Sequence, residues 1–206
     1  MKRFGVDPNS ISLILITHFH GDHFGGLPFF LLDAQFGKRR DPLTIVGPPG
    51  LHDHLTQVRE ISFPGSSTTV PKFDLTLLEW ESGQPLSLHP LVATPYEVSH
   101  SENLRAFTLR IAAEGRAITY SGDTEWCSGL AEAASGADLF VCEAYVYEKP
   151  VKGHLALKTL EAQLPALQTK RLILTHLGPD MLTRADSLGH EVAEDGQIVE
   201  VASGLS

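Results

Sequence analysis

Cysteine and long apolar runs are both scarce in this sequence of 206 residues. The two cysteines, Cys127 and Cys142, stand among apolar or small residues and are too few for a small disulfide-rich fold. The opening residues do not form a charged-then-apolar leader, and no apolar run reaches the ~18–20 residues that a membrane-spanning helix needs. We therefore expect a cytoplasmic protein, without a membrane partner, whose two thiols are reduced.

Positive charge is also in short supply. Lys and Arg number 16 against 25 Asp and Glu, which leaves a net charge of −9. A protein that grips long stretches of nucleic-acid backbone needs clustered Lys and Arg, so the acidity argues against that class. Hydrophobic residues make up 42% of the chain, enough for the core of a single domain spanning residues 1–206. Histidine is plentiful, at ten residues.

Apolar runs in the chain repeatedly end at a polar residue that could bind a metal. Residues 11–17 predict a strand buried on both faces, which ends at His18. A hairpin of residues 106–111 and 117–121 leads to Asp123, and a strand over 171–175 ends at His176. Further elements are expected at 27–36 and 51–61 (helices), 43–46 and 138–143 (strands), 155–167 (helix) and 197–201 (strand). Strands mixed with helices on this scale predict a layered α/β domain.

The sequence Thr-His-Phe-His-Gly-Asp-His places four potential ligands directly after the first predicted strand. Alternate residues of an extended chain point to one face, so His18 and His20 can converge on one ion. Asp22 and His23 follow the bend at Gly21 and can aim at a second ion. Imidazole together with carboxylate suits zinc, manganese or iron better than calcium. Three histidines and an aspartate within six residues favour a metal loop over a solvated polar loop.

Three more ligand types stand at the ends of later predicted strands. His100 follows Tyr-Glu-Val-Ser, Asp123 follows Ile-Thr-Tyr-Ser-Gly, and His176 follows Leu-Ile-Leu-Thr. A rigid strand can hold each ligand to the tolerance that a metal demands. An aspartate in such a set can bridge two cations, which lower the pKa of a water held between them.

These motifs, in this order, resemble the metallo-β-lactamase superfamily. The loop of residues 18–23 matches its signature, and Ser99-His100, Ser121-Gly122-Asp123-Thr124 and Thr175-His176 match its later ligand motifs. Within the superfamily, Cys142-Glu143-Ala144 followed by Gly153-His154-Leu155 is similar to the ribonuclease Z-like phosphodiesterase branch. The resemblance covers essentially the whole chain.

The resemblance implies a four-layer αββα sandwich and a metal-dependent hydrolase that binds two divalent ions. Zinc is the expected metal, with manganese or iron as alternatives. The implied ligands are His18, His20 and His100 for one ion, Asp22, His23 and His176 for the other, and Asp123 between them. Asp22 would also orient the attacking hydroxide. His154 would act at the scissile phosphate or protonate the leaving oxygen, while Glu143 holds its other ring nitrogen.

Two departures from the family pattern refine the expectation. Nothing between Gly47 and His100 looks like the long arm with which members that process transfer RNA hold their substrate, and Leu-Gly-Pro-Asp follows His176 in place of Ser-x-Arg. With the negative charge, this favours a small or cyclic phosphodiester over RNA. Only 17 residues precede His18, so the first strands of the amino-terminal sheet are expected to be missing. The resemblance also suggests a homodimer.

Several alternatives remain open from the sequence. The same metal pair could polarise a carbonyl, which gives a hydrolase of ester, thioester, lactone or lactam bonds. A transfer-RNA 3′-processing endonuclease and a catalytically silent metal-binding domain are the others. Outside the motifs, Lys38-Arg39-Arg40 is interpreted as a solvated helix end, and His52 and His54 as surface polar groups. Trp80 and Trp126 are interpreted as packing residues, with Trp126 also placed to line the mouth of a pocket.

Overall fold

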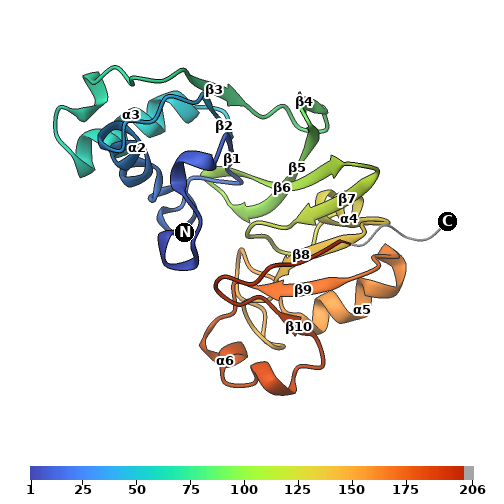
Figure 1. Cartoon of the computed structure of the whole chain (residues 1–206). Helices are drawn as coiled ribbons and strands as arrows, with labels where there is room; N and C mark the ends of the chain where they lie inside the picture. Colours follow the sequence, from blue (N-terminus) through green and yellow to red (C-terminus); the bar gives the residue numbers. More distant parts are fainter. Residues whose placement is uncertain (202–206) are drawn as a thin grey trace. The chain divides into compact units, whose positions relative to one another are not determined.

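The chain divides into two compact units, which we call unit 1 (Met1–Trp80) and unit 2 (Glu81–Ser206). A computed structural model describes residues 1–201 of it. Both units combine strands with helices, which confirms the predicted α/β class (Figure 1). Among the described residues, no helix is both long and apolar enough to cross a membrane.

Unit 1 is built on three parallel strands in the order β1-β2-β3. Their bounds are β1 Leu13–Leu15, β2 Leu43–Gly47 and β3 Leu75–Glu79. The connecting helices are α1 Gly21–Phe24, α2 Leu27–Phe36 and α3 Leu51–Ser62, with single 3₁₀ turns at Lys2–Phe4, Pro8–Ser10 and Ser66–Thr68. Leu43 and Ile45 of the central strand are fully buried and share one core with Leu31 of α2 and Leu51 and Leu55 of α3.

Unit 2 is built on seven strands in the order β10-β9-β8-β7-β6-β5-β4. The strands are β4 Leu86–Leu88, β5 Leu91–Ser101, β6 Leu104–Ala113, β7 Arg116–Tyr120, β8 Leu139–Glu143, β9 Leu172–Thr175 and β10 Glu191–Val192. Strands β4 to β7 pair antiparallel and β7 to β10 pair parallel. The helices are α4 Ser128–Ala134, α5 Leu157–Leu167 and α6 Pro179–Leu182, with a 3₁₀ turn at Ala185–Ser187.

Helices α4 and α5 form the parallel crossovers of this second sheet (Figure 1). Phe140 and Cys142, alternate residues of β8, share one core with Leu130 of α4 and Leu160 of α5. Gly129 permits the close approach of α4, because a Cβ there would stand 2.2 Å from the carbonyl oxygen of Glu97 on β5. The described cysteines, Cys127 and Cys142, are both free thiols.

Most predicted elements agree with the structure, while the terminal strand does not. The helix expected at 27–36 is α2, the helix expected at 51–61 is α3, and the hairpin is β6 and β7. The strand expected at 197–201 is wrong, because the edge of β9 pairs with Glu191 and Val192 instead. After β10 the chain forms a turn, in which the Gln197 backbone N–H donates to the Glu194 carbonyl.

Arg39 is buried, contrary to the solvated position expected for the Lys38-Arg39-Arg40 run. Its side chain is 2% exposed, and its guanidinium lies 5.4 Å from the centre of the Phe73 ring. It donates to the backbone carbonyls of Pro8, Asn9, Ile11, Asp41 and Pro42, at distances of 2.6 to 3.3 Å. The planar fork of arginine thus joins the segment before β1 to the segment before β2.

Replacing Arg39 by Met should lower the free energy of unfolding by about 3 kcal/mol, because several buried carbonyls lose a charged donor. Arg39→Lys should recover only part of this loss, since an ammonium lacks the fork geometry. Urea unfolding followed by circular dichroism measures the change, with the exposed Arg40→Met as the matched control. Equal stability of the two Met variants would contradict the role given to Arg39.

Asp138 joins three segments at the start of β8. Its carboxylate accepts from Lys170 Nζ at 2.7 Å and from the Ala117 backbone N–H at 2.8 Å, and lies 3.4 Å from Arg116. The bond from Lys170, followed by the bond from Ala117, lowers the pKa of Asp138 to about 2. The negative charge of Asp138 is therefore favoured in the folded protein.

The Asp138→Asn variant should be less stable than the parent at neutral pH. The folded-state pKa lies below the unfolded value, so the advantage of the parent is complete above about pH 4 and disappears as the pH falls through about 2. Thermal unfolding of both proteins across this range measures the difference. The exposed Asp195→Asn serves as the control, and a pH-independent gap would contradict the assignment.

Candidate functional site

The histidine-rich loop of unit 1 follows β1, and two hydrogen bonds fix the backbone of Ile16 just before the loop. The Ile16 N–H donates to the Val46 carbonyl at 2.8 Å, continuing the pairing of β1 with β2. The Trp80 indole N–H donates to the Ile16 carbonyl at 2.8 Å, and Trp80 is 3% exposed. Trp80 is therefore a packing residue, as expected, and it also holds the strand end two residues before His18.

The side chains of the loop lie close to one another. The ring centre of His18 lies 4.8 Å from that of His20 and 4.2 Å from that of His23. His23 and Asp22 stand on the single turn of α1, with His23 Nε2 3.3 Å from Asp22 Oδ2. Unit 1 thus brings its four predicted ligands together. Nearby, the Phe19 ring stacks on His54, with centres 4.1 Å apart.

The candidate residues of unit 2 lie at one edge of its sheet. Strands β7, β8 and β9 are parallel, and β5 runs in the same direction as β7 because both are antiparallel to β6. The carboxyl ends of all four strands therefore meet at one edge. His100 lies near the end of β5, Asp123 follows β7, Glu143 ends β8 and His176 follows β9.

Asp123 is the centre of this second cluster. Its side chain is 3% exposed, and its Oδ2 lies 4.0 Å from His100 Nε2, 3.9 Å from His154 Nδ1 and 3.5 Å from His176 Nε2. Ligand atoms of His100, Asp123 and His154 lie within 4.8 Å of one another, as do those of Glu143, His154 and His176. Imidazoles around a carboxylate at this spacing fit a zinc-like divalent cation.

Glu143 and His154 form a pair beside Asp123. Glu143 Oε2 lies 3.2 Å from His154 Nδ1, and Glu143 Oε1 accepts the backbone N–H of Thr124. The Glu143 side chain is fully buried, and this burial raises the pKa of its carboxyl group, while the bonds from His154 and Thr124 lower it. The pair matches the sequence expectation that Glu143 holds one ring nitrogen of His154.

Two residues of the cluster, Tyr145 and Glu125, were missed from the sequence. Tyr145 stacks on the His154 ring, with centres 4.4 Å apart and planes 25° apart. The Glu125 carboxylate accepts the backbone N–H of Gly153, whose carbonyl in turn faces His100 Nδ1. The Cys-Glu-Ala-Tyr run placed Tyr145 close to Glu143 in the chain, but only the paired strands bring it to His154. His176 itself has a φ of 53°, a left-handed conformation that is uncommon for a residue other than glycine.

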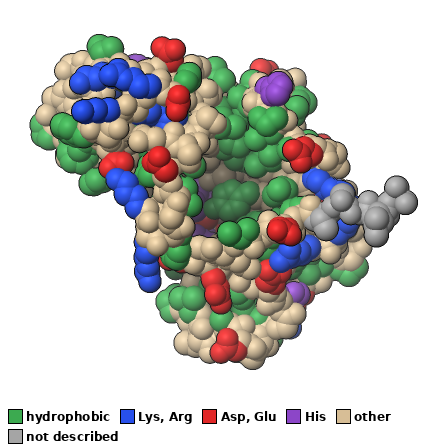
Figure 2. All heavy atoms as spheres, viewed as in Figure 1, with side chains coloured by type: hydrophobic (Ala, Val, Ile, Leu, Met, Phe, Trp, Pro, Cys, Tyr) green, Lys and Arg blue, Asp and Glu red, His purple; other side chains and the backbone are tan. Residues whose placement is uncertain are grey.

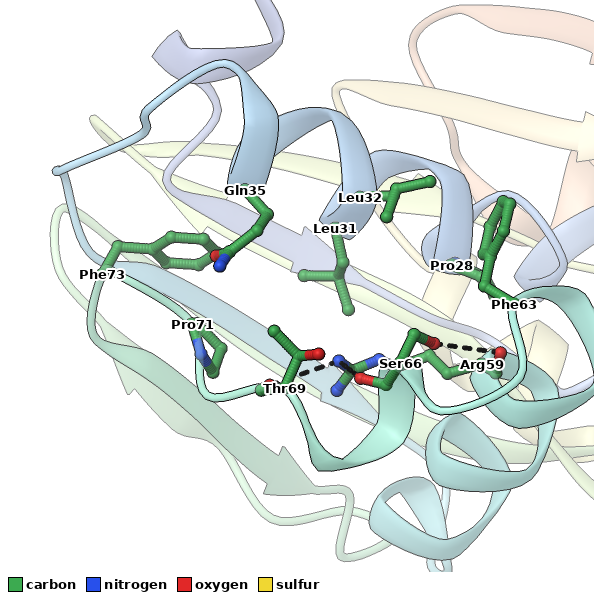
Figure 3. A pocket seen from close by; sticks show the side chains of 10 residues that line it. All are labelled: Pro28, Leu31, Leu32, Gln35, Arg59, Phe63, Ser66, Thr69, Pro71 and Phe73. Atoms are coloured by element: carbon green, nitrogen blue, oxygen red, sulfur yellow. Dashed lines mark hydrogen bonds between the residues drawn. The ribbon is translucent and has the colours of Figure 1, made fainter.

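A hollow of about 250 Å³ adjoins His154. Trp126, Lys152, Leu155 and Thr159 line it, so Trp126 does line a pocket in addition to packing on the core. A second cavity, of about 50 Å³, lies in unit 1 between Leu31 of α2 and Arg59 of α3 (Figure 3). It is far smaller than the ~300–1,000 Å³ of typical ligand sites and contains none of the predicted ligands. We assign it to helix packing.

Comparison with known proteins establishes the family. Residues 3–177 match the beta-lactamase superfamily domain. The chain belongs to the β-lactamase superfamily. This match spans every predicted ligand from His18 to His176 and confirms the resemblance inferred from the motifs.

Similar proteins within the superfamily include one of undefined role and one named ribonuclease Z. An uncharacterized protein of Mycobacterium leprae, ML1173, is 32% identical over 97% of this chain and 70% of its own length. A ribonuclease Z of Agathobacter rectalis is 26% identical over 94% of this chain and 79% of its own. The short form of human tRNase Z superposes with a TM-score of 0.74 at 22% identity, covering 98% of this chain and 83% of the other. The fold and the hydrolase class are thereby confirmed, and divalent metal binding is implied.

Proposed function

We propose that this protein is a dinuclear-metal phosphodiesterase that acts on small phosphodiesters, cyclic ones included. The Glu143–His154 pair beside Asp123 carries the proposal. A carbonyl hydrolase has no need of a histidine at the leaving-group side of a phosphate, whereas a phosphodiesterase must neutralise or protonate the leaving oxygen. The free thiols of Cys127 and Cys142 support a cytoplasmic location.

We further propose that ligands from both units belong to one dinuclear zinc centre within a single domain. His18, His20 and His100 would hold one ion, and Asp22, His23 and His176 the other, with Asp123 shared. The order of the motifs and a family match that spans 3–177 support this assignment. The gathering of histidines within each unit supports it as well.

Different residues of the chain would serve different steps of phosphodiester hydrolysis. When bound, divalent cations neutralise charge at the phosphoryl oxygens and lower the pKa of the attacking water. Asp22 would orient that water through its carboxylate. Glu143 orients His154 through its contact with Nδ1, and His154 would then give a proton to the leaving oxygen. The stacked Tyr145 restricts rotation of the His154 ring.

Surface charge and shape support a small substrate. On the face shown in Figure 2, the Lys and Arg side chains of unit 2 are interspersed with Asp and Glu side chains. Arg171, for example, bonds to Glu191 at 2.7 and 2.9 Å. The hollow of about 250 Å³ beside His154 is suited to a compact leaving group. The resemblance also supports a homodimer, which sedimentation analysis tests.

Metal removal should abolish hydrolysis. We expect the chelated protein to lose turnover of a chromogenic phosphodiester, and zinc or manganese to restore it. Metal analysis after reconstitution should find about two zinc ions per chain, and fewer in Asp123→Ala, because this carboxylate is the proposed shared ligand. Full turnover in the metal-free protein would contradict the proposal.

His154→Ala should reduce phosphodiester turnover by about 100-fold or more while leaving the metal content unchanged, because it removes a proton donor and not a proposed ligand. His52→Ala is the matched control, since the His52 side chain is 76% exposed on α3. Steady-state kinetics on phosphodiester, ester and thioester substrates measure the effect. Unchanged phosphodiester turnover, or preferred cleavage of an ester, would favour the carbonyl hydrolase instead. Efficient, site-specific cleavage of precursor transfer RNA would overturn the small-substrate assignment.

A further inference from the structure

We infer that Glu125 is a positioning residue for His100 and acts through the backbone of Gly153. Glu125 Oε1 accepts the Gly153 N–H at 2.6 Å, and the Gly153 carbonyl faces His100 Nδ1 at 2.6 Å. The two bonds lie on opposite sides of one residue. Glu125 therefore sets where the carbonyl that meets the imidazole can lie. The metal role of His100 rests on the proposed function, whereas the contacts belong to this chain alone.

The bond to Gly153 determines which ring nitrogen of His100 carries the hydrogen. A carbonyl oxygen can only accept, so Nδ1 must donate, and the neutral ring then has its lone pair on Nε2. His100 Nε2 is the nitrogen that lies 4.0 Å from Asp123 Oδ2. We call the two bonds, from the Gly153 N–H to Glu125 and from His100 Nδ1 to the Gly153 carbonyl, the relay. The relay orients the lone pair of His100 towards the proposed metal position. Outer contacts of this kind orient ligating histidines and raise their affinity for metal.

Gly153 can serve in this relay because it has no side chain. Its φ is 82°, a left-handed conformation that favours glycine. A Cβ at this position would stand 2.5 Å from the His100 carbonyl oxygen and 3.1 Å from His100 Nδ1. Any larger residue would push the imidazole away from the carbonyl that fixes it.

The backbone of Glu125 also contacts β5, the strand that carries His100. Its N–H donates to the carbonyl of Ser99, the residue before His100, at 2.7 Å. The neighbouring Thr124 N–H donates to Glu143 on β8. The two residues after Asp123 therefore connect the ends of β5 and β8 and the loop that precedes α5. Only the side-chain bond to Gly153 can be removed by substitution at position 125.

Three variants isolate that bond. Glu125→Ala removes the acceptor, Glu125→Gln keeps an acceptor oxygen of the same reach without the charge, and Glu125→Asp keeps the charge but shortens the reach. Glu102→Ala is the matched control, because Glu102 pairs with the neighbouring Lys152 at an exposed site, where its side chain is 78% exposed.

The first readout is the tautomer of His100, measured by ¹⁵N NMR of the ring nitrogens in metal-free protein. We expect the Nδ1–H form in the parent, in Glu125→Gln and in Glu102→Ala, and a mixture with the Nε2–H form in Glu125→Ala and Glu125→Asp. The second readout is zinc affinity by competition with a chelator. Glu125→Ala should bind zinc about 10–100-fold more weakly, with Gln restoring the affinity.

The outcomes are distinct. Unchanged tautomer and zinc affinity in Glu125→Ala and Glu125→Asp, or a Gln variant that behaves like Ala, would overturn the relay. If Glu125→Ala does not fold, the Asp and Gln variants decide by the same two measurements. A parent protein that shows the Nδ1–H form and its loss in Glu125→Asp, but binds no zinc, would support the relay and contradict the proposed metal function.

Discussion

Burial of the Asp123 carboxylate is the constraint on which the rest of unit 2 depends. An ionised carboxylate that is 3% exposed needs compensating positive charge or hydrogen-bond donors. Three imidazoles stand within 4.0 Å of its Oδ2. Such a group can be held at the end of β7 because four strands present their carboxyl ends at one edge. A buried cluster of this kind is costly for stability, which supports the functional role that we propose for it.

A second buried carboxylate, Glu143, has surroundings that differ from those of Asp123. Asp123 faces three imidazoles, whereas Glu143 faces His154 on one oxygen and a backbone N–H on the other. Burial raises the pKa of Glu143, and the hydrogen bonds from His154 and Thr124 oppose that rise. His154 lies 3.9 Å from Asp123 Oδ2 and also lines, with Trp126, the hollow of about 250 Å³. This position is the basis of the role in proton transfer that we propose for His154.

Local pattern made a large part of this site predictable. His18, His20, Asp22 and His23 lie within six residues, so the alternation of an extended chain and one glycine bend place them without any knowledge of the fold. Helix α2 was likewise readable from helical spacing that ends at Gly37. Contacts that depend on a backbone carbonyl could not be predicted from the sequence. The Gly153–His100 bond joins residues 53 positions apart through an atom that every residue possesses.

The sequence by itself identified the candidate metal-binding side chains, the order in which they occur, and the family to which the chain belongs. It misplaced Arg39, because a basic run reads as solvated unless distant carbonyls are known to surround one of its members. Only the tertiary structure decided that Asp123 is the centre of the second cluster, that Tyr145 stacks on His154 and that Glu125 reaches the backbone beside His100. The physical reason is that strand pairing converts long separations along the chain into contacts of a few ångströms, and no local pattern records that conversion.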